Sequence, residues 1–185
     1  MRKLNSGKIL LHVCCAGCLL RYEKSGGDVV ADLWFYNPNI YPKTEYDARR
    51  EAVRQIATQK DLELIIPDYR PSDYFAVQKK LWQEGNIEDK TQRCFNCFSL
   101  RLDSSMKFAK ENGYQRVSST MLASEHLPHE MIDQVGKEMA EKYGLEWITL
   151  ALPELNDFHP SGFYQQNFCG CLFSLWEKTR DKYCM

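Results

Sequence analysis

The sequence has neither a long apolar run nor an excess of one charge. The apolar stretch from Ile9 to Val13 is far shorter than the ~20 residues of a membrane span, and it is too short for the core of a secretory signal. The 24 Lys and Arg residues are balanced by 25 Asp and Glu residues, so the formal net charge is only -1. We therefore do not expect a globally basic, non-specific nucleic-acid binder, although a local basic patch is still allowed. We expect a cytoplasmic protein without membrane contact.

Glycine and proline are also scarce, with 10 and 7 residues among 185. This scarcity excludes a collagen-like fibre and a low-complexity array. Hydrophobic residues make up 44% of the chain, which is enough apolar material for a domain with its own core. No repeat or linker divides residues 1–185, so we expect a single domain.

Cysteine, in contrast, is abundant. Three groups with the spacings CC-x-x-C, C-x-x-C and C-x-C account for seven of the eight: Cys14, Cys15, Cys18, Cys94, Cys97, Cys169 and Cys171. In a reducing cytosol, such close spacing is typical of metal ligands or redox thiols rather than of structural disulfides. The eighth, Cys184, has no near partner, and we expect it to be inert.

Short apolar runs alternate with helical patterns along the chain. Runs bounded by polar or turn residues predict strands at Lys8–Val13, Val29–Tyr36, Leu62–Ile66, Arg116–Ser119 and Trp147–Leu150. Helical spacing predicts a helix that begins at Thr44 with Asp47 in a capping box, and further helices at Ser72–Gln83, Phe95–Asn112 and His129–Tyr143. This alternation indicates an α/β fold with a mainly parallel sheet.

The first cysteine group directly follows the first predicted strand. In an open α/β sheet, ligands bind beyond the carboxyl ends of the strands, so we expect the metal site there. A glycine pair at Gly26-Gly27 resembles a phosphate-binding loop, but it precedes a strand instead of following one, and we interpret it as a turn. His12, inside the first strand, is interpreted as a core histidine, and Trp34 and Tyr36 as core aromatics.

Two cysteine pairs together supply four thiolates. Cys94 and Cys97 are expected near the start of a helix and share one face of it, which suits zinc or an iron–sulfur cluster. The adjacent Cys14 and Cys15 are unusual for structural zinc, whose paired ligands are normally two to four residues apart. The spacing therefore favours a [4Fe–4S] cluster on these four residues, with zinc as the alternative.

Cys169-Gly170-Cys171 is a different signal. A disulfide between residues two apart is strained and readily reduced, so the pair suits either electron relay or coordination of an additional iron. Cys18 fits either the first group or this pair. Asp157 and His159 lie shortly before the pair and are candidate proton donors, with a solvated loop as the alternative.

Four motifs in order carry a resemblance to a known family. They are Leu11-His12-Val13-Cys14-Cys15-Ala16, then Phe35-Tyr36-Asn37-Pro38-Asn39-Ile40 with Glu45-Tyr46, then Arg93-Cys94-x-x-Cys97, and finally Tyr164-x-Gln166-Asn167-x-Cys169-Gly170-Cys171. With these motifs the chain resembles the QueH-type, cobalamin-independent epoxyqueuosine reductases over roughly Lys8 to Trp176. The resemblance implies a Rossmann-like fold of the adenine nucleotide alpha hydrolase group.

The resemblance also implies an activity and its site. The epoxide on the modified wobble base of tRNA would be reduced to an alkene, with electrons from a donor that the sequence does not identify. Cys14, Cys15, Cys94 and Cys97 match the cluster-binding cysteines of the family, and Cys169 and Cys171 match its redox-active pair. In a variant of this arrangement, Cys18, Cys169 and Cys171 hold a second iron.

Two stretches depart from the family pattern, at Ser124–Pro128 and Asn156–Phe163, and the second lacks the basic residues of its relatives. Candidate RNA contacts are Tyr41 for stacking on a base and, for phosphates, Lys43, Arg49, Arg50, Arg93 and Arg101. Two other functions use the same cysteines: a zinc-stabilised RNA-binding module, and a thiol–disulfide oxidoreductase that acts through the C-x-C pair.

Overall fold

A five-stranded parallel sheet forms the centre of the protein. The computed structural model describes residues 7–26, 31–149 and 161–183. The strands are β1 (Ile9–His12), β2 (Ala31–Trp34), β3 (Leu64–Ile65), β4 (Arg116–Ser119) and β5 (Glu146–Trp147), in the order β3-β2-β1-β4-β5. β1 is the central strand, since Ile9 is in register with Ala31 of β2 and with Arg116 of β4. The predicted α/β fold with a parallel sheet is confirmed.

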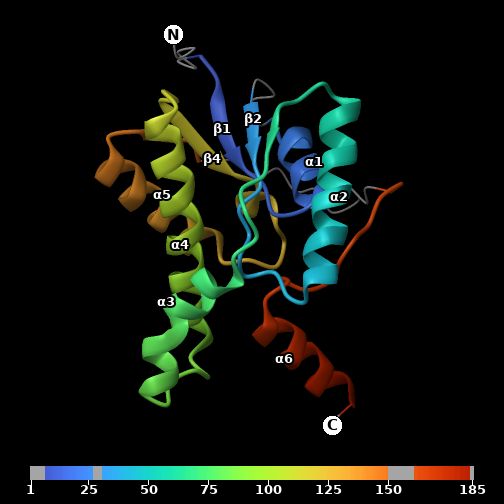
Figure 1. Ribbon diagram of the computed structural model, residues 1–185, viewed down its shortest axis with the longest axis vertical. Coiled ribbons are helices and arrows are strands. Elements are labelled where there is room, and N and C mark those ends of the chain that lie inside the picture. Colours follow the sequence, from blue (N-terminus) through green and yellow to red (C-terminus); the bar gives the residue numbers. More distant parts are fainter. Residues whose placement is uncertain (1–6, 27–30, 150–160, 184–185) are drawn as a thin grey trace.

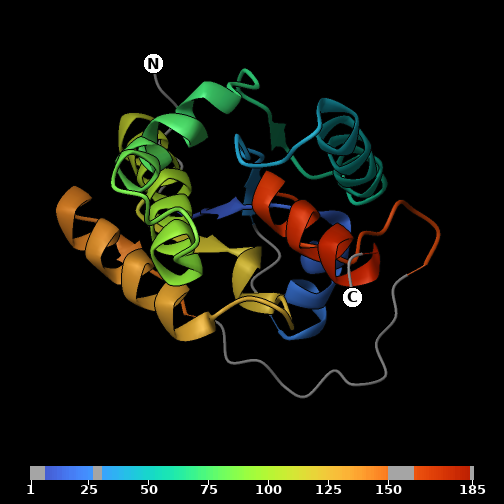
Figure 2. The same cartoon turned by 90° about the horizontal axis from the view of Figure 1, so that it is seen from below.

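Helices cover both faces of this sheet. They are α1 (Ala16–Lys24), α2 (Lys43–Gln59), α3 (Pro71–Gln83), α4 (Lys90–Glu111), α5 (His129–Tyr143) and α6 (Leu172–Tyr183), with a 3₁₀ helix, η1, at Thr120–Ala123. α1 and α2 lie on one face, and α4 and α5 on the other (Figures 1 and 2). Ile9 and Leu11 of β1 pack toward the first pair and Leu10 toward the second, which explains why the strand is apolar throughout.

The chain order opens a crevice at the carboxyl ends of the strands. After β1 the chain runs outward through β2 and β3, and it then returns to the other side of β1 to form β4 and β5. The segments that follow β1 and β4 therefore diverge, which is the arrangement that creates ligand sites in such sheets. The strand arrows point toward α6, which lies below the carboxyl ends of the strands (Figure 1).

Several helix boundaries differ from the prediction. The helix at His129–Tyr143 is confirmed, with Gly144 in the left-handed conformation at its end. α4 begins at Lys90 rather than at Phe95, because the Asp89 side chain accepts a hydrogen bond from the Gln92 N–H and caps the helix earlier. The thiols of this helix therefore lie in its second turn. α2 begins at Lys43 without a capping box, since Asp47 pairs instead with Lys43 and Arg50.

Two helices were not predicted. α1 begins directly after Cys15, and α6 directly after Cys171, so each of these cysteines stands at a helix N-terminus. The interpretation of His12 is confirmed: it is fully buried, with Nδ1 2.9 Å from Ser119 Oγ and Nε2 3.2 Å from the Tyr36 carbonyl oxygen. Trp34 and Tyr36 are buried, as predicted. Among the described residues, the structure contains no helix with the length and apolarity to cross a membrane.

Candidate metal centre

All seven clustered cysteines line a single pocket. It lies beyond the carboxyl end of β1, has a volume of about 800 Å³, and is enclosed by α1, α3, α4, the segment around Ser124–Pro128, and the C-terminal segment with α6. Each of the seven is a free thiol in the structure. Three cysteine groups that are up to about 150 residues apart in sequence thus meet where the sequence predicted the site.

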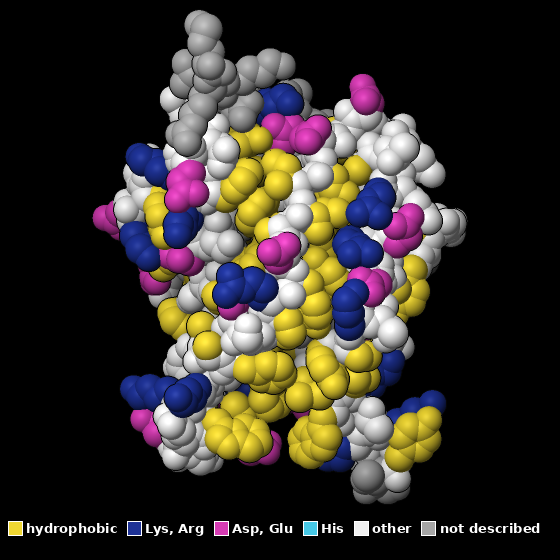
Figure 3. All heavy atoms as spheres, in the orientation of Figure 1, with side chains coloured by type: hydrophobic (Ala, Val, Ile, Leu, Met, Phe, Trp, Pro, Cys, Tyr) yellow, Lys and Arg dark blue, Asp and Glu magenta, His cyan; other side chains and the backbone are white. Residues whose placement is uncertain are grey.

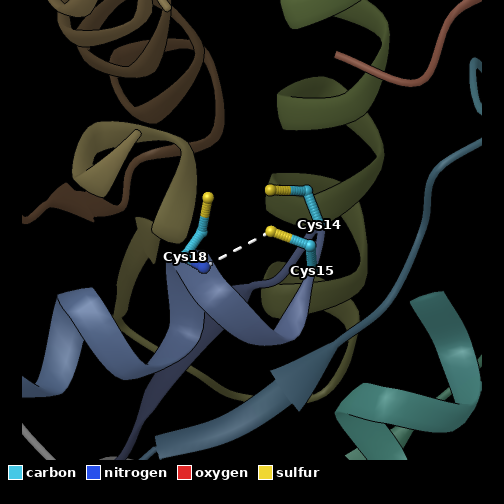
Figure 4. A group of neighbouring side chains, drawn as sticks. All are labelled: Cys14, Cys15 and Cys18. Atoms are coloured by element: carbon cyan, nitrogen blue, oxygen red, sulfur yellow. Dashed lines mark hydrogen bonds between the residues drawn. The ribbon is translucent and has the colours of Figure 1, made fainter. Parts of the chain in front are cut away.

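Cys14, Cys15 and Cys18 form one triad within the pocket. Their sulfur atoms lie within 4.8 Å of one another and face a common space (Figure 4). Cys15 is the N-cap of α1, and its sulfur accepts a hydrogen bond from the Cys18 N–H at 3.3 Å. The capping geometry explains the CC-x-x-C spacing, because an N-cap side chain reaches the backbone three residues later. Cys18 therefore lies with the first group.

The triad shares negative charge. Hydrogen bonds from Cys15 and Cys18 lower the pKa of Cys14 well below its usual value. For Cys18, hydrogen bonds with Cys14 and Cys15, together with burial, raise the pKa. One thiolate is thus stabilised by two thiols that keep their protons. A bound cation would take the place of those protons, which is how thiol groups of this kind bind metals.

Cys94 and Cys97 face the pocket from α4. Burial raises the pKa of Cys97 to about 12, although the positive charge of Arg101 opposes this shift. Burial also raises the pKa of Cys94, with the charge of Cys171 adding to the effect. As bare thiols these residues stay protonated at neutral pH, so their use as ligands depends on a metal to displace the protons.

Cys171 lies at the N-terminus of α6, where its sulfur accepts a hydrogen bond from the Ser174 N–H at 3.3 Å. A hydrogen bond from Cys169, together with those from Ser174, lowers the pKa of Cys171 to about 5 despite its burial. Tyr74 of α3 also interacts with this thiolate through its hydroxyl group. The C-x-C pair therefore holds one thiolate and one thiol, an arrangement compatible with both of its predicted roles.

Arg49 of α2 holds the C-x-C loop in place. Its guanidinium donates to the carbonyl oxygens of Cys169 at 3.0 Å and Phe168 at 3.1 Å, while Nε donates to Glu45 at 2.6 Å. Tyr164 donates to the other oxygen of Glu45. Arg49 and Glu45 are buried, with Arg49 only 2% exposed, while Tyr164 is exposed. Sequence reasoning treated Arg49 as a surface phosphate contact; the Glu45–Arg49 spacing of one helical turn was the available signal of an internal pair.

Of the other predicted RNA-contact residues, some are exposed and others are buried. Tyr41 is 42% exposed, and its N–H donates to the Gly170 carbonyl oxygen, so it lies beside the C-x-C loop. Lys43 is exposed and pairs with Asp47 at 2.6 Å. Arg93 is buried, bonded to Glu177 and to the Ile87 carbonyl oxygen. Arg101 is 2% exposed and is not available at the surface to an RNA phosphate. Asp157, His159 and Cys184 lie outside the described residues.

The chemistry of the pocket fits an iron–sulfur centre. Arg101 carries a buried positive charge, and its Nε has no hydrogen-bond partner among the described residues. The charges that act on it are those of the thiols Cys97, Cys14 and Cys169. A buried cation needs a compensating anion, and here anionic sulfur supplies it. The seven thiols around this cation include the four that a [4Fe–4S] cluster takes; a zinc ion also takes four, so the number of thiols alone fits both groups.

Comparison with known proteins places these residues in a family. A family model described as epoxyqueuosine reductase QueH matches residues 9–177. The protein named epoxyqueuosine reductase QueH in Thermotoga maritima is 33% identical over 184 residues, which cover 96% of this chain and 94% of that protein. Its namesake in Dehalococcoides mccartyi is 32% identical over 180 residues, 92% of this chain and 94% of that protein.

A third relative with the same name, from Acinetobacter baylyi, is 33% identical over 190 residues, which cover 95% of this chain and 84% of that protein. The match to the family model includes all seven cysteines of the pocket. The chain belongs to the epoxyqueuosine reductase QueH family.

Proposed function

We propose that this protein reduces the epoxide of epoxyqueuosine at the wobble position of tRNA to give queuosine. Two electrons and two protons enter, the two carbon–oxygen bonds of the epoxide break, an alkene forms, and the oxygen leaves as water. The electrons come from an external one-electron reductant. The observation that carries the proposal is the meeting of seven thiols in one pocket of a chain that belongs to this family.

In this proposal Cys14, Cys15, Cys94 and Cys97 hold a [4Fe–4S] cluster, which supplies one-electron transfer when it is bound. Cys169 and Cys171 act as a redox pair, or they hold an additional iron together with Cys18. The position of Cys18 in the triad with Cys14 and Cys15 supports its participation at the centre. Arg49 keeps the C-x-C backbone at the pocket wall in either case.

The pocket mouth carries groups suited to RNA. The lower end of the molecule is notched between α3 and α6, and apolar side chains gather on both sides of the notch (Figure 3). Trp82 of α3 and Trp176 of α6 are exposed aromatic side chains, and Tyr41 is exposed beside the C-x-C loop. Lys178 and Lys182 of α6 line the pocket. Aromatic rings that stack on unpaired bases, beside cations that contact phosphates, are the usual means of binding a single-stranded loop.

The target base must leave its stack to reach the thiols. The Tyr41 N–H bonds to the C-x-C loop and its side chain is exposed, so we propose that its ring stacks on the displaced base and that the exposed Lys43 contacts a phosphate. We propose Asp157 and His159 as the proton donors to the departing oxygen, because they precede the C-x-C pair in sequence.

The first experiment is anaerobic purification followed by measurement of iron, acid-labile sulfide and zinc per chain. About four irons and four sulfides per chain are expected. The same preparation, with dithionite as reductant, should convert epoxyqueuosine in tRNA to queuosine. Cys94→Ser should lower cluster content and turnover together, while Ser105→Ala, a buried change about three turns further along the same helix, should leave both near wild type.

Two results would replace the proposal. Stoichiometric zinc without sulfide, persisting after anaerobic reconstitution with iron and sulfide, would favour the zinc-stabilised RNA-binding module. Turnover of disulfide substrates that survives Cys14→Ser and disappears in Cys169→Ser would favour the thiol–disulfide oxidoreductase.

A further inference from the structure

Arg101 is the largest fully buried side chain of the described residues. It lies on α4 one turn after Cys97, so the two side chains share a face of the helix. Arginine is rarely buried to this extent unless its charge is paired. The position therefore demands a specific partner for the guanidinium.

No carboxylate takes that role among the residues that the structure describes. The Nη2 atom donates to the Asn37 amide oxygen at 2.7 Å, and Asn37 in turn donates to the Val13 carbonyl oxygen at 2.9 Å. These partners are neutral, and Nε has no hydrogen-bond partner among the described residues. Two other buried arginines near the pocket are different: Arg49 pairs with Glu45, and Arg93 with Glu177.

The charge of Arg101 is directed at sulfur instead. Burial alone lowers the pKa of Arg101, but its interactions with Cys97, Cys14 and Cys169 outweigh that effect and raise it. These three residues come from the three cysteine groups of the chain. A single guanidinium thus interacts with one member of every cysteine group in the pocket.

We propose that Arg101 is the internal counter-charge of the thiolates, and that it raises the reduction potential of the iron–sulfur centre they hold. The part concerning iron and sulfide rests on the proposed function; the pairing with thiolates does not. Arg101 is a positioning residue in this proposal, since it acts through the sulfur ligands and does not touch the substrate.

The direction of the effect follows from charge. A thiolate-bound cluster becomes more negative when it accepts an electron, and a fixed positive charge nearby favours that state. Net charge and hydrogen bonds to the sulfurs are among the factors that set cluster potentials. The interaction is strong because the guanidinium is shielded from water and so is poorly screened.

The test is the midpoint potential of the anaerobic protein, measured by a dithionite titration followed by electron paramagnetic resonance. In Arg101→Gln, the ratio of reduced to oxidised cluster at a fixed potential should fall at least tenfold, which corresponds to about 59 mV for one electron. Arg101→Lys keeps the charge and should shift the ratio much less. Arg54→Gln, which removes one charge from an exposed site on α2, should leave the potential unchanged.

A second variant guards against loss of the cluster in Arg101→Gln. Asn37→Asp leaves the guanidinium in place but puts a carboxylate against Nη2, so it should lower the potential in the same direction. An unchanged midpoint potential in Arg101→Gln would overturn the proposal. If Arg101→Gln binds no iron, an unchanged midpoint potential in Asn37→Asp would overturn it instead. So would an Arg54→Gln shift of equal size.

Metal analysis of the wild type separates this inference from the proposed function. If the wild type binds no iron and sulfide, the proposed function fails, and Arg101 is then tested in metal-free protein. Alkylation of Cys97 by iodoacetamide, followed by peptide mass spectrometry, should be at least tenfold slower at neutral pH in Arg101→Gln than in wild type or Arg54→Gln. Equal rates would overturn the pairing with thiolates.

Discussion

Gly170, between the two cysteines of the C-x-C pair, is in contact with the residue that holds the loop. Its φ is +102°, and a Cβ atom built on it would lie 2.8 Å from Arg49 Cζ. Gly162 offers a matched control, because its φ is +94° but a Cβ atom there would meet nothing within 4 Å. Gly170→Ala and Gly162→Ala therefore share the backbone strain and differ in the collision with Arg49.

The magnitudes follow from these contacts. A positive φ costs an alanine about 1–2 kcal/mol at either position. At Gly170 the added methyl must displace the guanidinium, and loss of one of its hydrogen bonds to the loop carbonyls adds about 1.5–3 kcal/mol. Each 1.4 kcal/mol is a factor of ten, so the C-x-C loop should open about 10- to 150-fold more often in Gly170→Ala than in Gly162→Ala.

The Tyr41 amide reports this opening, because its N–H donates to the Gly170 carbonyl oxygen at 2.8 Å. Hydrogen exchange at Tyr41, followed by NMR, should be faster in Gly170→Ala by that factor. In an Arg49→Ala background the collision is gone, so the two alanine variants should then differ little from each other. Equal exchange in Gly170→Ala and Gly162→Ala on the wild-type background would refute the role assigned to Arg49.

Three further predictions concern RNA contact, α6 and β5. Tyr41→Ala should weaken tRNA binding by about 1–3 kcal/mol through lost stacking, and Tyr41→Phe should not; a fluorescence titration that finds both variants equal would contradict the contact. Arg93→Ala removes the partner of Glu177 and the cation over the Phe173 ring, so it should weaken the attachment of α6 by about 1–3 kcal/mol. Chymotrypsin should then cleave α6 faster in Arg93→Ala than in the control Arg54→Ala. Equal cleavage rates in the two variants would count against Arg93 as the anchor of α6. The pKa of Asp133 is lowered: burial alone would raise it, but hydrogen bonds from Lys137, Thr149 and Trp147 outweigh that effect. The ionised carboxylate therefore stabilises the fold above the unfolded pKa of about 3.9, and this stabilisation is lost as the pH falls through the folded pKa. Urea unfolding of metal-free protein should show Asp133→Asn less stable by about 1–2 kcal/mol at pH 7, with the gap closing toward pH 3; a gap independent of pH would exclude the ionised carboxylate as its cause.

The strands of the sheet were predictable because each contains apolar residues, and in β1 and β2 every residue is buried. Their ends were not predictable in the same way. Phe35 and Tyr36 are as buried as the residues of β2, although they lie beyond the end of that strand in the segment that leads to the pocket. Hydrophobicity marks burial, so it does not show where hydrogen bonding between the strands stops.

The two missed helices had different causes. α1 is capped by the sulfur of Cys15, and cysteine is not among the residues that usually mark a helix start. α6 has no buried residue, so burial in the core does not account for its formation. Its attachment depends on Arg93, which is distant in sequence, and on the C-x-C loop that directly precedes the helix.

The candidate site was predictable as a set of residue types but not as an arrangement. Cysteine spacing identified the seven thiols, because ligands on one turn or loop must be close in sequence. The internal roles of Arg49 and Arg101 depend on how α2 and α4 pack against the sheet. A charged residue in a helix is usually solvated, and apart from the Glu45–Arg49 spacing nothing local distinguishes these two from Arg54 on the helix surface.

The origin of the pocket wall in three distant segments has a consequence for biosynthesis. While a chain is being made, Cys14, Cys15 and Cys18 leave the ribosome long before Cys169 and Cys171, and the fold cannot enclose them until the later segment has followed. During that interval the early thiols are exposed to oxidation and to pairing with Cys94 or Cys97. High yields of intact protein should therefore depend on a reducing environment throughout translation, and iron supplied only after purification would reach a population already partly cross-linked.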